Sequence, residues 1–270
     1  MDFGLDETQQ SVADLAATVL GGDSDGNRAE QAFAGPAGYD ETLWKAMGQA
    51  GLLSLAVPTE LGGDGLGPVE VACVLTEVGR QILPVPALAT LSLGVLPLTM
   101  LAPVELQQAL LPEVTDGRVL SGAIRADIRA EGDAEGVGTV LLTGTARGVP
   151  YALQAHRVLL PTTVGVYAVD PRGEGVTCVR TPTSSKSPEY TVSMRQAPVT
   201  RSELVSTDVR AAERLALAGA AALADGVLAG ALELTARHLR ERHQFGRTVS
   251  VRIRRGPRCA PTIRACVSTT

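Results

Sequence analysis

The chain has 270 residues, of which 45% are hydrophobic and only 3% aromatic, and its formal net charge is −5. This length allows one large domain or two to three smaller ones with a substantial buried core. The acidic balance excludes a generally basic surface of the kind that binds nucleic acid.

Residues 1–116 are predicted to form an all-helical domain. Asp6 can cap a first helix, whose apolar positions recur at helical spacing up to Gly21. A second helix is expected over residues 40–50. A third is expected over residues 68–79, because proline fits the first position of a helix. Two further helical stretches complete this domain.

The loop at residues 60–67 is rich in glycine. It could be mistaken for a phosphate-binding loop, but it lacks Gly-Lys-Ser/Thr and is not framed by a strand and a helix of a βαβ unit. We therefore interpret it as a structural turn.

Residues 117–208 change to short runs rich in Val, Thr and Leu, separated by Gly and Pro. Five runs are expected to be strands: residues 139–144, 157–161, 165–169, 176–180 and 189–193. No helices of the length that parallel sheets need alternate with these runs, so the spacing predicts a small antiparallel sandwich or barrel. Residues 209–247 return to a helical pattern, with about nine turns expected over residues 209–243.

Targeting, membrane and metal signals are weak. Met1 is followed by acidic residues rather than a basic segment and an apolar core, so a cytoplasmic protein is expected. Apolar stretches at 83–101 and 215–232 are interrupted by prolines and by Asp225, and neither is predicted to span a membrane. The four cysteines show no Cys-x-x-Cys spacing, and with three histidines no metal site or disulfide framework is predicted.

Three segments of the chain carry a family resemblance. They are Gly51–Pro58 with the following Gly62-Gly63-Asp64-Gly65, Glu70 and Glu77-Val78-Gly79-Arg80; Leu142–Ala152 with Arg157–Pro161; and Leu232–Arg247, which ends in Arg-x-x-Phe-Gly. They resemble the acyl-CoA dehydrogenase family, of the actinobacterial type that acts on bulky acyl groups. The resemblance covers residues 1 to about 247. It implies an α+β multi-domain fold: an N-terminal all-helical domain, a small antiparallel β-domain in the middle and the start of a C-terminal helical bundle.

The resemblance also implies a chemistry. In the family, a carboxylate removes the α-proton of an acyl-CoA thioester while FAD accepts the β-hydride. By resemblance, Arg242 contacts the pyrophosphate of an FAD held mainly by a neighbouring subunit, and Phe245 lies beside the adenine portion. A planar guanidinium suits phosphate oxygens. The alternative explanation of Arg242 is a cation at the negative end of a helix dipole. A homo- or hetero-oligomer that binds FAD across a subunit interface is expected.

Three departures from the family pattern bear on activity. The family's flavin-binding Thr-Glu-Pro-x-x-Gly-Ser-Asp is not recognisable at residues 121–132. Its Trp-Ile-Thr becomes Gly-Val-Pro at 148–150, where proline has no N–H to donate. The helices that carry the catalytic glutamate in most members do not follow residue 247. A minority places this glutamate earlier, which makes Glu213 a candidate base. Its spacing to Arg242 is longer than in that minority, and a glutamate near a helix N-terminus also complements the helix dipole.

Residues 248–270 form an aberrant basic tail. They carry five arginines and no carboxylate, together with two of the four cysteines. An arm that binds nucleic acid or a membrane would explain the arginines. The tail replaces family sequence instead of adding to it, and its apolar and cysteine residues are unlike such an arm. A change of reading frame is the interpretation we favour, and neither nucleic acid nor a membrane is an expected partner.

Three functional hypotheses stay open. The first is an FAD-dependent acyl-CoA dehydrogenase for branched or steroid side-chain acyl-CoA substrates, truncated and incomplete or inactive alone. The second is a non-catalytic structural partner subunit of a heteromeric acyl-CoA dehydrogenase. The third is a frameshift remnant without activity. The departures in the β-domain favour the partner subunit, and the general resemblance favours the enzyme.

Overall fold

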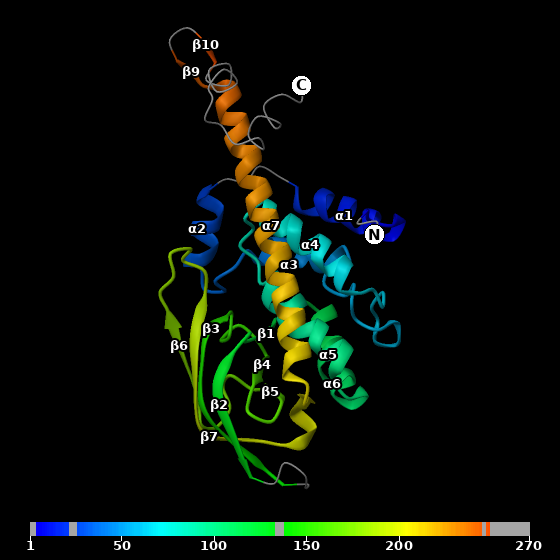
Figure 1. Ribbon diagram of the computed structural model, residues 1–270, viewed down its shortest axis with the longest axis vertical. Coiled ribbons are helices and arrows are strands. Elements are labelled where there is room, and N and C mark those ends of the chain that lie inside the picture. Colours follow the sequence, from blue (N-terminus) through cyan, green and yellow to red (C-terminus); the bar gives the residue numbers. More distant parts are fainter. Residues whose placement is uncertain (1–3, 22–25, 133–137, 245–246, 249–270) are drawn as a thin grey trace.

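The computed structural model describes residues 4–21, 26–132, 138–244 and 247–248. Helices come first along the chain, strands follow, and one long helix runs past both (Figure 1). This order confirms the predicted α+β fold class, with a helical first part, small antiparallel sheets and a C-terminal helix.

The helical part begins with a capped helix, as predicted. Its elements are α1 (Glu7–Leu20), α2 (Gly26–Ala34), α3 (Glu41–Gln49), the 3-10 turn η1 (Thr59–Leu61), α4 (Pro68–Arg80), the π-helix η2 (Leu88–Val95), α5 (Leu96–Leu101) and α6 (Val104–Thr115). The Asp6 carboxylate caps α1 by accepting a hydrogen bond from the Gln9 N–H over 2.8 Å. Helix α2 was not predicted, because Phe33 is its one large apolar side chain and gives no helical periodicity.

The loop before α4 is a structural turn, as interpreted. A Cβ atom on Gly63 would lie 2.2 Å from the Val57 carbonyl oxygen, so the backbone passes too close for any other residue. The carboxylate of Glu70 accepts a hydrogen bond from the Gly67 N–H over 2.8 Å and thereby caps α4. These family-like residues therefore shape the loop and the helix end.

The strands form two four-stranded sheets. They are β1 (Leu120–Gly122), β2 (Ala126–Gly132), β3 (Val140–Pro150), β4 (Arg157–Pro161), β5 (Val166–Val169), β6 (Val176–Thr181), β7 (Glu189–Val199) and, after the 3-10 turn η3 (Arg201–Glu203), β8 (Leu204–Ser206). The orders are β1-β4-β5-β8 and β2-β3-β7-β6. All neighbours are antiparallel, as predicted, except β1 and β4, which are parallel.

Three of the eight strands in these two sheets were not predicted from the sequence. In β2 only Ile128 is buried, so alternation of apolar and polar residues is too weak to indicate a strand. Strands β1 and β8 have three residues each, which is too short for a periodic signal. Strands β3 and β7 extend beyond the predicted runs because they pair with each other along most of their length.

Direct hydrogen bonds join the helical part to the β part. Trp44 Nε1 donates to the Gly117 carbonyl oxygen over 2.7 Å, and the Thr90 hydroxyl donates to the Leu120 carbonyl oxygen over 3.2 Å. Apolar side chains from both parts belong to one continuous core. The small sheets are therefore held against the helices and not merely tethered to them.

The long helix α7 (Val209–Glu241) packs on α4 with unusually close backbones. A Cβ atom on Gly226 would lie 1.9 Å from the Thr76 carbonyl oxygen, and one on Gly230 would lie 2.1 Å from that of Arg80. No side chain larger than hydrogen fits at either position without moving a helix. The glycines of α7 thus set the distance between the two helices.

Family-like residues of α4 lie at this contact. A Cβ atom on Gly79 would be 2.2 Å from the Leu223 carbonyl oxygen. The guanidinium of Arg80 reaches Glu233 on α7 at 3.0 Å and Glu77 on its own helix at 3.3 Å. The segment 77–80 therefore serves to dock α7.

The C-terminal end of helix α7 extends beyond the other helices and the two four-stranded sheets (Figure 1). By length and composition alone it is apolar enough to cross a membrane, although Asp225 lies in its middle. Strands β9 (His243–Gln244) and β10 (Arg247–Thr248) follow as an antiparallel pair. The predicted basic tail lies outside the described residues from 249 onward.

His156 occupies the junction between α6 and β4. Its Nδ1–H donates to the Val119 carbonyl oxygen over 2.9 Å, and Nε2 faces Glu113 Oε2 at 3.4 Å. The side chain is 11% exposed. Burial lowers the pKa of His156 from its ordinary value of 6.5, against the opposing effects of the Val119 hydrogen bond and the Glu113 carboxylate.

Stability is expected to decrease in mildly acidic solution because of His156. With a lowered pKa in the folded state, the unfolded chain takes up the proton first as the pH falls through about 6.5, which favours unfolding. The free energy of unfolding in urea should therefore be lower at about pH 5.5 than at about pH 7.5. His156→Asn retains a donor near Nδ1 and removes the titration, so it should flatten this dependence. Stability that instead rises toward pH 5.5 would mean that attraction to Glu113 prevails.

Candidate functional site

The candidate base Glu213 is tied to an arginine of the β part. It lies in the second turn of α7, whose N-terminus is capped by Asp208 accepting from the Ala211 N–H over 2.9 Å. Glu213 Oε1 accepts a hydrogen bond from Arg125 Nε over 2.7 Å, and the two side chains are 24% and 83% exposed. Helix-dipole effects are concentrated in the first turn. The ion pair with Arg125 is therefore the main interaction of Glu213.

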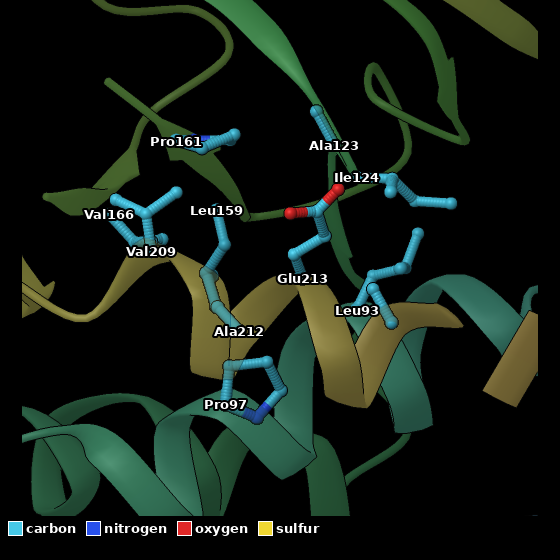
Figure 2. A pocket seen from close by; sticks show the side chains of 11 residues that line it. Leu93, Pro97, Ala123, Ile124, Leu159, Pro161, Val166, Val209, Ala212 and Glu213 are labelled. Atoms are coloured by element: carbon cyan, nitrogen blue, oxygen red, sulfur yellow. The ribbon is translucent and has the colours of Figure 1, made fainter. Parts of the chain in front are cut away.

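Beside this ion pair is a small apolar pocket, shown in Figure 2. Its lining comes from η2, α5, the segment after β1, β4, β5 and α7: Leu93, Pro97, Ala123, Ile124, Leu159, Pro161, Val166, Val209, Ala212, Glu213 and Ala216. The free space is about 10 Å³, the least that one water molecule needs. A pocket for a small-molecule ligand is typically at least about 300 Å³. The chain in this conformation has no room for an acyl group here.

Ser121 and Pro150 lie in the two segments of the β part that depart from the family's flavin-contacting pattern. Ser121 is fully buried, and its hydroxyl donates to the Pro150 carbonyl oxygen. Pro150 has no N–H, and both Val149 and Pro150 pair with β7 in the sheet. The one buried hydroxyl at this place is thus satisfied internally. Neither the Ser121 hydroxyl nor Pro150 therefore offers a free hydrogen-bond donor to a flavin.

Arg242 lies at the opposite end of α7 from Glu213. It is the C-cap residue, and its N–H donates to the His238 carbonyl oxygen over 2.9 Å while its side chain is exposed. At about 1.5 Å per residue, the stretch from Glu213 to Arg242 is roughly 43 Å long. One active site within one chain cannot contain both residues. Phe245 lies outside the described residues, so its predicted place beside adenine stays a prediction.

Arg125, the charged partner of Glu213, was not singled out from the sequence. It is far from Glu213 in the sequence, and no spacing rule connects a residue before β2 with the second turn of α7. The sequence offered one signal for Arg125: this residue lies in the segment that replaces the family's flavin-binding motif. Among residues in the described ranges, no group of three His, Cys, Asp or Glu side chains could hold a metal ion.

Comparison with known proteins agrees with this architecture. The sequence model of the acyl-CoA dehydrogenase N-terminal domain matches residues 6–118. Acyl-CoA dehydrogenase FadE28 of Mycobacterium tuberculosis strain H37Rv is 41% identical over 254 residues, which cover 93% of this chain and 69% of that protein. The chain belongs to the acyl-CoA dehydrogenase family.

Two solved structures of family members are similar along most of the chain. The ChsE4-ChsE5 complex from Mycobacterium tuberculosis has a TM-score of 0.82 and 29% identity, covering 93% of this chain and 71% of the solved one. The steroid acyl-CoA dehydrogenase variant Tcur3481-Tcur3483 G363A has a TM-score of 0.80 and 30% identity, covering 90% and 70%. The name of each structure gives two different subunits. The family predicted from three short segments is therefore confirmed.

Proposed function

We propose that this chain is the structural partner subunit of a heteromeric, FAD-dependent acyl-CoA dehydrogenase. The reaction is the α,β-dehydrogenation of an acyl-CoA thioester with a branched or steroid side chain, and the base and the acyl pocket belong to the catalytic subunit. In this assembly FAD accepts the hydride. This chain contributes Arg242, which contacts the FAD pyrophosphate across the subunit interface.

One observation carries the proposal: the pocket beside Glu213 has only about 10 Å³ of free space, and the Glu213 carboxylate is paired with Arg125. A base needs a free carboxylate within reach of the substrate carbon. The internal hydrogen bond of Ser121 to Pro150 supports the same conclusion for the flavin. The two-subunit composition of the similar ChsE4-ChsE5 and Tcur3481-Tcur3483 structures supports a heteromer.

The proposal is tested by purifying the chain alone and together with a catalytic subunit of the family. Flavin absorbance and dye reduction with a steroid side-chain acyl-CoA are measured for each preparation. We expect neither flavin nor turnover for the chain alone, and both for the complex. Flavin and turnover by the chain alone would overturn the structural-partner assignment.

A second candidate is an enzyme that uses Glu213 of this chain as its base. The orientation of Glu213 favours it, because the carboxylate extends beside Ala123 and Ile124 at the edge of the apolar pocket (Figure 2). In the complex, Glu213→Gln should leave turnover unchanged under the structural-partner proposal. A loss of turnover by about a hundredfold or more, the usual contribution of a general base, would favour this second candidate. Flavin content provides the control for correct assembly.

A further inference from the structure

Helix α2 lies outside the hydrophobic core. Of its apolar side chains, Ala29, Ala32 and Phe33 are partly exposed and Ala34 is exposed. Among the described residues, neither the core nor the set of side chains packed against it includes a member from α2. The helix has nine residues, which is too few for an isolated helix to be stable in water. Contacts other than core packing therefore hold α2 in place.

Two ion pairs connect α2 to its surroundings. Arg28 Nε lies 2.6 Å from Asp40 Oδ2, and Asp40 also caps α3 by accepting a hydrogen bond from the Leu43 N–H over 2.9 Å. Glu30 Oε1 lies 2.5 Å from Lys186 Nζ, in the turn between β6 and β7. Figure 1 shows α2 beside this end of the β6–β7 hairpin. Because both side chains of the second pair are more than 60% exposed, dissolved salt screens their attraction.

The turn that carries Lys186 also holds the end of β3. Two residues after Lys186, the carbonyl oxygen of Pro188 accepts a hydrogen bond from the Tyr151 N–H over 2.8 Å. The connection from α2 to α3 approaches the same proline, because a Cβ atom on Gly38 would lie 2.7 Å from Pro188 Cγ. Pro188 therefore lies between the connection that follows α2 and the end of β3.

Tyr151 has a strained backbone. Its φ of 52° lies in the left-handed region, which a bulky residue seldom adopts. The side chain is only 6% exposed, and its ring packs edge-on against that of Tyr39, with 6.1 Å between the ring centroids. Tyr39 directly follows Gly38 in the connection from α2. A strained conformation persists only where its surroundings hold it, and here the surroundings are Pro188 and this connection.

We propose that α2 is a strap, closed by its two ion pairs, that stabilises the left-handed turn at Tyr151 through Pro188. When an ion pair is lost, α2 moves away on the hinge formed by Gly35 and Gly38. The turn at Pro188 then loses a neighbour, and its hydrogen bond to Tyr151 opens more often. Tyr151 directly follows residues 148–150, one of the segments that depart from the family pattern, so the strap controls how rigid that segment is. The device needs neither flavin nor an acyl-CoA.

Amide hydrogen exchange of the full chain, measured by mass spectrometry, tests the proposal. At low salt, Glu30→Gln should speed the exchange of α2 and of the turn at Tyr151 together, by up to about fivefold, the limit for an exposed ion pair. Asp40→Asn should act in the same direction, because asparagine keeps the cap of α3 and loses the charge. About 0.5 M NaCl should speed exchange in the wild type at both places. Glu233→Gln, which removes the ion pair of a 54% exposed glutamate with Arg80, should leave both unchanged.

Exchanging the two charges separates an effect of charge from one of shape. Glu30→Lys and Lys186→Glu should each speed exchange, and the double variant should restore the protection of the wild type. Failure of the double variant to restore it would overturn the proposal. Equally slow exchange of α2 in the wild type and in Glu30→Gln would do the same, as would faster exchange of α2 without any change at Tyr151. Urea unfolding verifies that each variant keeps its global stability, so that the exchange reports local opening.

Discussion

Gly226→Val is expected to destabilise the protein by about 3 kcal/mol, the upper part of the usual range for overpacking. A Cβ atom at this position would be 1.9 Å from the Thr76 carbonyl oxygen. The contact is with backbone, so relief requires α4 and α7 to separate, and no rotation of a side chain suffices. Separation would also disturb the neighbouring contacts of Gly230 and the Arg80–Glu233 ion pair.

The measurement is urea unfolding followed by far-UV circular dichroism, with Ala224→Val as the matched control. Ala224 lies on the exposed side of the same helix, so valine there should cost only about 0.5 kcal/mol through helix propensity. Similar losses for the two variants would contradict the close α4–α7 packing. An unchanged free energy of unfolding for Gly226→Val would contradict this packing even more strongly.

Arg242→Ala is expected to weaken FAD binding in the assembled dehydrogenase. If the guanidinium donates to the pyrophosphate as proposed, the loss should be about 1.5 to 3 kcal/mol, the usual range for hydrogen bonds to charged groups. This corresponds to roughly 10- to 100-fold in the dissociation constant. The position at the end of an exposed helix makes the residue accessible to a neighbouring subunit.

Flavin retention after dilution and gel filtration measures this effect. Arg242→Lys should recover part of the affinity, because lysine keeps the charge and loses the planar fork. Arg240→Ala serves as the control, since Arg240 is exposed in the last turn and its Nε donates to the Ala236 carbonyl oxygen. Equal flavin loss for Arg240→Ala and Arg242→Ala would indicate a general effect of charge and contradict a specific contact.

Much of the fold could be predicted from local signals. Asp6 and Pro68 mark helix starts, and strand β4 (Arg157–Pro161) has the predicted bounds. The segments that carried the family resemblance are also short and local. The candidate site was harder to predict, because the sequence presented Glu213 as a helix-end carboxylate and did not indicate Arg125 as its partner.

The amino-acid sequence alone determined the order of helical and β parts, the family, and the departures that question flavin binding. Tertiary structure decided which groups are available for chemistry. It paired Glu213 with Arg125 and enclosed the Ser121 hydroxyl against Pro150. Caps and periodic patterns act within a few residues and so remain legible in a sequence. Contacts between distant segments depend on how close their two backbones come. In this chain, glycines such as Gly226 set that distance, and they do so only after α4 has packed beside α7.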